Sequence, residues 1–145
     1  MPLKLTLKPG ERFVLNGAVI VNGDKRSSLV IQNQACILRE RDILREDEVD
    51  TPAKRIYFPI MMMYLEPTAR SDWYDEFVIR MTEFMGVVTS PDLMASCLAV
   101  SRDVMENNLY PALTKCRQLI ALEGERLANV VTGVSSDSED SRKSA

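Results

Sequence analysis

The chain has 145 residues, of which 46% are hydrophobic and 27% are charged, and its formal net charge is −3. These values are typical of a soluble globular protein with one domain, or with a small module and a larger body that share a core. Because it has no histidine, and three widely separated cysteines without a C-x-x-C pair, the sequence indicates neither a histidine-based catalytic centre nor a disulfide framework or zinc site.

The first 45 residues predict a small antiparallel β module. Apolar and polar residues alternate there with the period of a strand. The expected strands are residues 3–7, 12–15, 18–21, 29–33 and 34–39. The second and third form either a tight hairpin at Asn16-Gly17 or one long strand bent at the glycine. Strands this short bury little surface, so the module must pair with a second copy or dock on the residues that follow.

Basic side chains are concentrated in this module. Up to residue 45 there are eight basic and four acidic side chains, a net charge of +4, whereas the other 100 residues carry 10 basic and 17 acidic side chains. The net negative charge of the whole molecule argues against general attraction to nucleic acid, so any RNA contact must be local. Lysines on exposed strands also prevent edge-to-edge pairing, and that alternative remains open.

Four helices are expected after a charged linker at residues 45–52. Thr51-Pro52 and Ser90-Pro91 each combine an N-cap side chain with a proline at the first helical position. The first helix, in TPAKRIYFPIMMMYLE, is expected to be kinked at Pro59, and the alternative is a short strand at residues 55–58 followed by a helix. The other helices are expected from residue 71 or 72 to 88, from 91 to about 107 and from 111 to about 130.

The expected fold class is therefore α+β, in three parts. A basic antiparallel β module of four to five short strands at residues 1–45 precedes a body of about four α-helices at residues 51–131 and a disordered acidic, serine-rich tail at residues 132–145. The longest apolar run, residues 56–65, is far below the roughly 20 residues that cross a bilayer, and the amino terminus lacks the apolar segment of a signal peptide. We expect a cytoplasmic protein without a membrane partner.

No group of residues points to catalysis. The sequence has no glycine-rich phosphate loop and no G-x-S-x-G motif, and without histidine it has no Ser-His or Cys-His nucleophile. Adjacent acids such as Asp75 and Glu76 face different sides of a helix and are most simply solvated. We therefore expect no enzyme activity, no cofactor and no bound metal.

Methionine is concentrated in the helical body, where seven of the eight lie between Met61 and Met105. Filling an irregular core is the usual role of such residues, and a flexible groove for a partner helix is the alternative. The partner-binding residues in that alternative are Met61, Met62, Met81 and Met85.

Three separated blocks of the sequence resemble one family. The opening LKLTLKPGERFVLNGAVIVNGD, the segment TPAKRIYFPIMMMYLE and the late LYPALTKCRQLIALEGE are together similar to the flagellin-regulating FlbT proteins of alphaproteobacteria. The resemblance implies a cytoplasmic post-transcriptional repressor that associates with the 5′ untranslated region of flagellin mRNA and promotes its degradation, although some members are thought to activate. It also implies a regulatory partner protein of opposite effect, and flagellin itself, as partners.

The β module alone resembles the carbon storage regulator CsrA, a small dimeric RNA-binding β protein. In that family, basic residues at the end of the first strand and on the last strand contact RNA. That family has two basic residues at the end of the first strand. By position, Lys8 matches the second of them, and Leu7 stands in place of the first. Arg39 matches the arginine of the last strand.

Two hypotheses of function follow. In the first, the β module, as a homodimer or docked on the helices, binds an unstacked region of a flagellin mRNA leader. The expected RNA-binding residues are Lys4, Lys8, Arg12, Arg39 and Arg41. If exposed, Tyr57, Phe58 or Trp73 would stack on bases. In the second, the protein is an adaptor or chaperone-like factor whose methionine-rich helices bind flagellin or a flagellar regulatory partner. A continuous basic face would favour the first hypothesis, and an open apolar groove the second.

Overall fold

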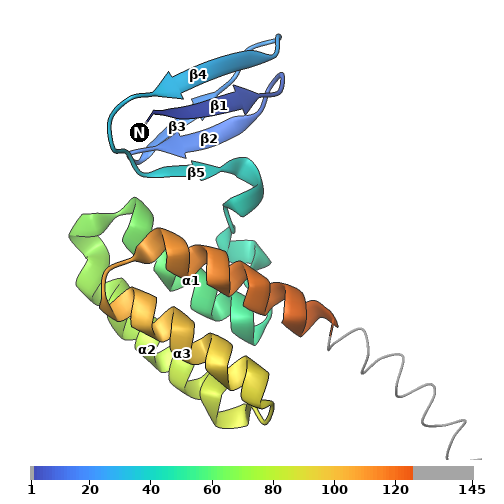
Figure 1. Cartoon of the computed structure of the whole chain (residues 1–145), viewed down its shortest axis with the longest axis vertical. Coiled ribbons are helices and arrows are strands. Elements are labelled where there is room, and N and C mark those ends of the chain that lie inside the picture. The colour runs from blue at the N-terminus through green and yellow to red at the C-terminus, as the bar shows by residue number, and fades with distance from the viewer. Residues whose placement is uncertain (1, 126–145) are drawn as a thin grey trace, which may run out of the picture.

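The computed structural model describes residues 2–125, in which a β module is followed by a helical body (Figure 1). The expected α+β class is confirmed, with five short antiparallel strands and, in these residues, four α-helices. The expected tail at residues 132–145, and the expected end of the last helix near residue 130, lie outside the described residues.

The five strands form two antiparallel sheets. They are β1 (Leu3–Leu7), β2 (Arg12–Leu15), β3 (Ala18–Val21), β4 (Ser27–Ile31) and β5 (Ile37–Arg39). β1 pairs with β4, and β2 lies between β3 and β5. Asn16 and Gly17 have φ angles of +49° and +85°, so the second and third strands form a tight hairpin and the alternative of one bent strand is wrong.

The last two strands differ from their expected bounds, because pairing decides where a strand ends. The five residues of β1 pair with residues 27 to 31, so β4 begins and ends two residues earlier than the alternation suggests. β5 starts at Ile37, three residues later than expected. The residue before it, Cys36, is hydrogen-bonded to Asn16 of the hairpin turn through the Asn16 side chain at 2.9 Å and backbone at 2.8 Å.

β5 connects two apolar cores. The smaller core lies within the β module and consists of Leu5, Leu7, Phe13 and Ile37. Leu38, the next residue, belongs to the larger core of the helical body. Successive side chains of a strand point to opposite faces, so one short strand packs against both parts of the protein.

The helices are α1 (Pro52–Leu65), α2 (Arg70–Val87), α3 (Pro91–Met105) and a final helix at residues 109–125. α1 and α3 begin where the sequence predicts, and α2 begins one residue before its expected start. The Thr51 hydroxyl accepts a hydrogen bond from the Lys54 N–H at 3.3 Å, and the Ser90 hydroxyl accepts one from the Leu93 N–H at 3.4 Å. Both N-caps are therefore confirmed.

One alternative is excluded and one helix start is corrected. α1 runs through Pro59 as one helix, so the alternative of a strand at residues 55–58 is wrong. The final helix begins at residue 109, two residues before Pro111. A proline in the first turn removes no intrahelical hydrogen bond, so it marks the start of a helix only to within a few residues.

α1 is the central helix of the larger core, because half of its 14 residues are buried. Glu123 of the final helix accepts a hydrogen bond from the Ala53 N–H at 2.9 Å. This N–H belongs to the first turn of α1, where no backbone partner exists and negative charge is favourable. The Glu123 carboxylate of the final helix is thus a cap for α1.

Two tyrosines of α1 join the helical body to the β module. The Tyr64 hydroxyl accepts a hydrogen bond from the Ile37 N–H at 2.9 Å and donates one to the Ile37 carbonyl oxygen at 3.1 Å. The Tyr57 hydroxyl donates to the carbonyl oxygen of Asp42, in the short 3-10 turn η1 (Glu40–Asp42) that follows β5. The chain leaving the sheet is therefore held against α1 at two points.

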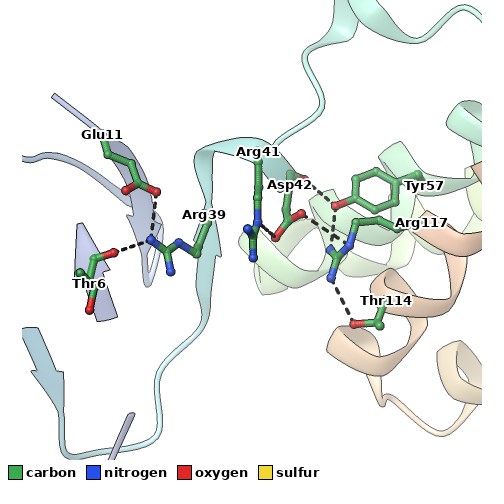
Figure 2. A network of polar contacts seen from close by, with 8 residues as sticks. All are labelled: Thr6, Glu11, Arg39, Arg41, Asp42, Tyr57, Thr114 and Arg117. Carbon is green, nitrogen blue, oxygen red and sulfur yellow. Dashed lines mark hydrogen bonds and ion pairs between the residues drawn. The ribbon is translucent and has the colours of Figure 1, made fainter. Parts of the chain in front are cut away.

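Arg117 of the final helix completes this junction (Figure 2). Its Nη1 donates to the Tyr57 hydroxyl at 3.3 Å, and its Nε lies 3.5 Å from Oδ1 of Asp42. Its Nη2 donates to the Thr114 hydroxyl at 3.2 Å. Tyr57 is only 2% exposed, and this burial raises its pKa to about 12.

Replacing Glu123 with alanine should lower the free energy of unfolding by about 1–2 kcal/mol, because the Ala53 N–H loses its partner. Urea unfolding followed by circular dichroism measures the change. Glu125→Ala is the matched control, since Glu125 is exposed on the same helix. Equal losses in the two variants would contradict the capping role.

The stability of the protein should fall between about pH 10 and pH 12. Below pH 10, Tyr57 is protonated in both the folded and the unfolded chain and contributes no pH dependence. Above it, the unfolded chain ionises first, and a rise of about two units corresponds to about 3 kcal/mol of stability lost as the pH approaches 12.

Tyr57→Phe should remove that part of the decline, while Tyr74→Phe, at an exposed position, should retain it. Urea midpoints measured at intervals from pH 8 to pH 12 make the comparison. The same alkaline slope in wild type and Tyr57→Phe would show that the junction tyrosine does not cause the decline.

Candidate nucleic-acid interface

Two loops meet at one end of the β module, where β1 ends and β4 begins (Figure 1). The Gly10 N–H donates to the Gly23 carbonyl oxygen at 3.0 Å, and the Asn22 side chain donates to the carbonyl oxygens of Lys8 at 2.7 Å and Lys25 at 2.9 Å. Ser27 donates to the Asn22 side-chain oxygen at 2.7 Å. Asn22 therefore holds the two loops together.

Exposed basic side chains surround this end of the module. Lys8 and Arg12 flank the first loop, and Lys25 and Arg26 lie on the second. η1 contacts β2 and carries Arg41, whose side chain is 80% exposed. We call this set, which consists of Lys8, Arg12, Lys25, Arg26 and Arg41, the basic edge.

Lys4 is exposed on β1, where its neighbours Leu5 and Leu7 point into the core. Four residues of strand separate it from Lys8, which corresponds to about 13 Å. Lys4 therefore lies apart from the basic edge, at the other end of the same strand. Lys25 and Arg26 were not among the expected contacts, although the positive charge of the loop that carries them was visible in the sequence.

Arg39 has a structural role. Its Nη2 donates to the Thr6 carbonyl oxygen at 2.7 Å and to Glu11 Oε2 at 3.0 Å, and the side chain is 28% exposed (Figure 2). The hydrogen bond from the Lys8 N–H, followed by that from Arg39, lowers the pKa of Glu11. Arg39 thus ties β5 to β1 and to the first loop, and Glu11 neutralises much of its charge.

A cleft of about 300 Å³ lies next to the basic edge, where η1 meets the helical body. Arg41, Lys54 and Arg117 line it together with apolar side chains that include Ile43 and Ile120. Lys54 is paired with Asp50 at 3.1 Å, and Arg117 is held by Asp42. Of these three cations, Arg41 is the most exposed.

The aromatic residues that would stack on bases if exposed are instead packed within the protein. Tyr57 is buried, and Phe58 packs edge-on against Trp73 with ring centroids 5.6 Å apart. Tyr110, which sequence reasoning did not select, is 46% exposed and has the guanidinium carbon of Arg117 5.9 Å from its ring centroid. Only the tertiary structure makes it a candidate for stacking.

The methionines expected to line a partner groove belong to the helical core. Met61 and Met81 are 3% and 4% exposed, and Met62 and Met85 are partly buried against the same cluster. The Met61 sulfur also accepts a hydrogen bond from the Leu44 N–H at 3.4 Å. This burial fits core filling, the usual role of such residues.

Reactive and metal-binding groups are scarce in the described residues. Cys97 and Cys116 are buried, which raises the pKa of both thiols and disfavours the reactive thiolate. Within residues 2–125, no cluster of three or more cysteine, aspartate or glutamate side chains is arranged to hold a metal ion. No described helix combines the length and apolar character needed to cross a membrane.

Comparison with known proteins agrees with the resemblance in the sequence. The family model described as "Flagellar protein FlbT" matches residues 3–127. The chain is 56% identical over 135 residues to the flagellum biosynthesis repressor protein FlbT of Caulobacter vibrioides (strain ATCC 19089 / CIP 103742 / CB 15), a match that covers 93% of this chain and 96% of the relative.

More distant relatives also match this chain over most of its length. The chain is 40% identical over 130 residues to a probable flagellum biosynthesis repressor protein FlbT of Rhodopseudomonas palustris (strain ATCC BAA-98 / CGA009), covering 88% of this chain and 99% of the relative. It is 28% identical over 125 residues to that of Mesorhizobium japonicum, covering 86% and 84%. No solved structure matches. Because these matches span the β module and the helical body together, the chain belongs to the FlbT family of flagellar proteins.

Proposed function

We propose that this protein represses flagellum biosynthesis in the cytoplasm by binding the 5′ untranslated region of flagellin mRNA and promoting degradation of that message. The names of its relatives, which describe repressors of flagellum biosynthesis, support the proposed repression. The basic edge is the observation that carries the RNA-binding part. Binding a phosphate backbone needs several cations held in fixed positions on one surface. The two loops of the β module, which Asn22 joins by hydrogen bonds, carry such cations.

Charge favours the β module as the site of the phosphate contacts. The residues after position 45, counted with the acidic linker and the tail, carry 17 acidic and 10 basic side chains, so this part of the chain attracts a polyanion less than the β module does. The one acidic side chain of the first loop, Glu11, is bound by Arg39 and by the Lys8 N–H, which reduces its repulsion. Lys8, Arg12 and Arg26 then contact phosphates, with Arg41 extending the contact towards the cleft beside η1.

Recognition of the leader also needs contacts with bases. Single-stranded regions expose base faces that stack on aromatic side chains, and Tyr110 is an exposed ring beside the junction. Lys4, on the outer surface of β1, adds a phosphate contact beyond the basic edge. Arg39 acts indirectly in this proposal, because it holds the first loop in place. Repression then comes from blocked ribosome access or a recruited nuclease, without chemistry by this chain.

The double variant Lys8→Gln/Arg26→Gln should weaken binding to a flagellin leader RNA and reduce its salt dependence. Loss of two phosphate contacts lowers the slope of log affinity against log salt by about 1.4, since each contact with a single strand contributes about 0.7. Filter binding across a salt series measures the slope, with a scrambled RNA of equal length as the control for selectivity.

The matched protein control is Arg55→Gln/Arg102→Gln, which removes two exposed positive charges from the helical body. It should bind with the wild-type slope. An equal loss in both double variants, or equal binding of the leader and the scrambled RNA, would contradict the proposed interface. Arg39→Gln is unsuitable for this test, because it also breaks the bonds that hold β1 and β5 together.

A further inference from the structure

A separate cavity of about 770 Å³ lies in the helical body, where α1 ends, α2 begins and α3 turns into the final helix. The 3-10 turn η3 (Pro67–Ala69), which links α1 to α2, forms part of its wall. In Figure 1 this is the left end of the helical body, whereas the loops of the basic edge lie on the right of the β module. The size is typical of a site for a small ligand or a few residues of a peptide.

Arg70, the first residue of α2, lines this cavity. Its Nε is buried and has no hydrogen-bond partner among the described residues, and the side chain takes part in none of their ion pairs. Because the Arg70 side chain is only partly buried and no described carboxylate neutralises it, a carboxylate from a ligand would form a stabilising charged pair with its guanidinium. A carboxylate beside Arg70 also lies at the positive end of an 18-residue helix.

The rest of the lining is mixed, with an apolar wall on one side and the polar residues Thr68, Ser71, Asp75 and Asn107 elsewhere. Met63, Val104 and Leu109 are buried in its wall, with exposed fractions of 1%, 5% and 6%. At the opening, Met105 is 72% exposed and Tyr74 is 36% exposed. The site therefore combines one guanidinium with an apolar wall, within a lining that also carries one carboxylate.

We propose that this cavity binds the carboxyl-terminal end of a partner polypeptide, with the terminal carboxylate on Arg70 and the last apolar side chain against Met63, Val104 and Leu109. A terminal residue carries its carboxylate and its side chain on one Cα, which matches a cation and an apolar wall in one cavity. An internal aspartate or glutamate would instead bring two flanking peptide groups against that wall. Asp75, also in the lining, offsets part of the positive charge of Arg70, so the cavity suits a single carboxylate better than a polyanion such as RNA.

The first test uses the whole protein labelled with ¹³C at its methionine methyl groups. The probe is the dipeptide N-acetyl-Leu-Leu, added once as the free acid and once as the carboxyl-terminal amide. The free acid should shift the Met63 and Met105 methyl signals saturably, and the amide should bind at least tenfold more weakly. Equal binding of acid and amide, or shifts spread over all the methionines, would overturn the proposal.

Two pairs of variants locate the site. Arg70→Gln should remove the preference for the free acid, whereas Arg102→Gln, an exposed arginine on α3, should keep it. Met105→Glu should repel the free acid at the rim, whereas Leu98→Glu, also at an exposed position of α3, should not. Because Met105 is exposed, its substitution tests the site even if Arg70→Gln fails to fold. Unchanged binding in Met105→Glu would overturn the assignment.

The proposal is independent of RNA binding. Met105→Glu should bind the flagellin leader RNA as the wild type does, and Lys8→Gln/Arg26→Gln should bind the dipeptide as the wild type does. Displacement of the bound dipeptide by a short single-stranded RNA would assign the cavity to RNA and overturn the proposal.

Discussion

The hydrogen bonds from two tyrosines of α1 to the main chain around β5 and η1 hold the two parts of this protein together. Tyr64 satisfies both the N–H and the carbonyl oxygen of Ile37, and Tyr57 binds the carbonyl oxygen of Asp42. Apolar packing at β5 adds to these hydrogen bonds, because Leu38 packs into the core of the helical body while Ile37 packs into the core of the β module. A core of four buried residues needs this support, since so small a module buries little surface by itself.

Fixing this segment also decides which basic groups face solvent. β5 ends at Arg39, which turns inward to Thr6 and Glu11, and η1 then projects Arg41 outward. Neutralising Glu11 leaves the nearby loop cations less opposed. Arg39 and Glu11 therefore stabilise the β module and also shape its surface charge. In the proposed RNA complex, their substitution would affect both stability and binding, whereas substitution of the exposed loop cations would affect binding alone.

The two proposed sites use opposite chemistry in different parts of the molecule. The basic edge presents several exposed cations for repeated phosphates, whereas the cavity at Arg70 holds a single cation within an apolar wall. An RNA and a polypeptide would then be bound by one chain without competing for the same residues. The two proposals together would let one chain respond to a partner polypeptide while it regulates a message.

The sequence by itself determined the local elements and the family. Alternation, Asn16-Gly17 and the two Ser/Thr-Pro pairs predict the first three strands, the hairpin and the starts of α1 and α3, because these depend on neighbouring residues. Only the tertiary structure decided that Arg39 clamps β1, that Glu123 caps α1 and that Met61 is core. The partners of Arg39 and Glu123 lie 33 and 70 residues away along the chain. Contacts at such separations leave no periodic pattern in the sequence. The sequence therefore does not show whether a charged or flexible side chain contacts solvent, a ligand or another part of the protein.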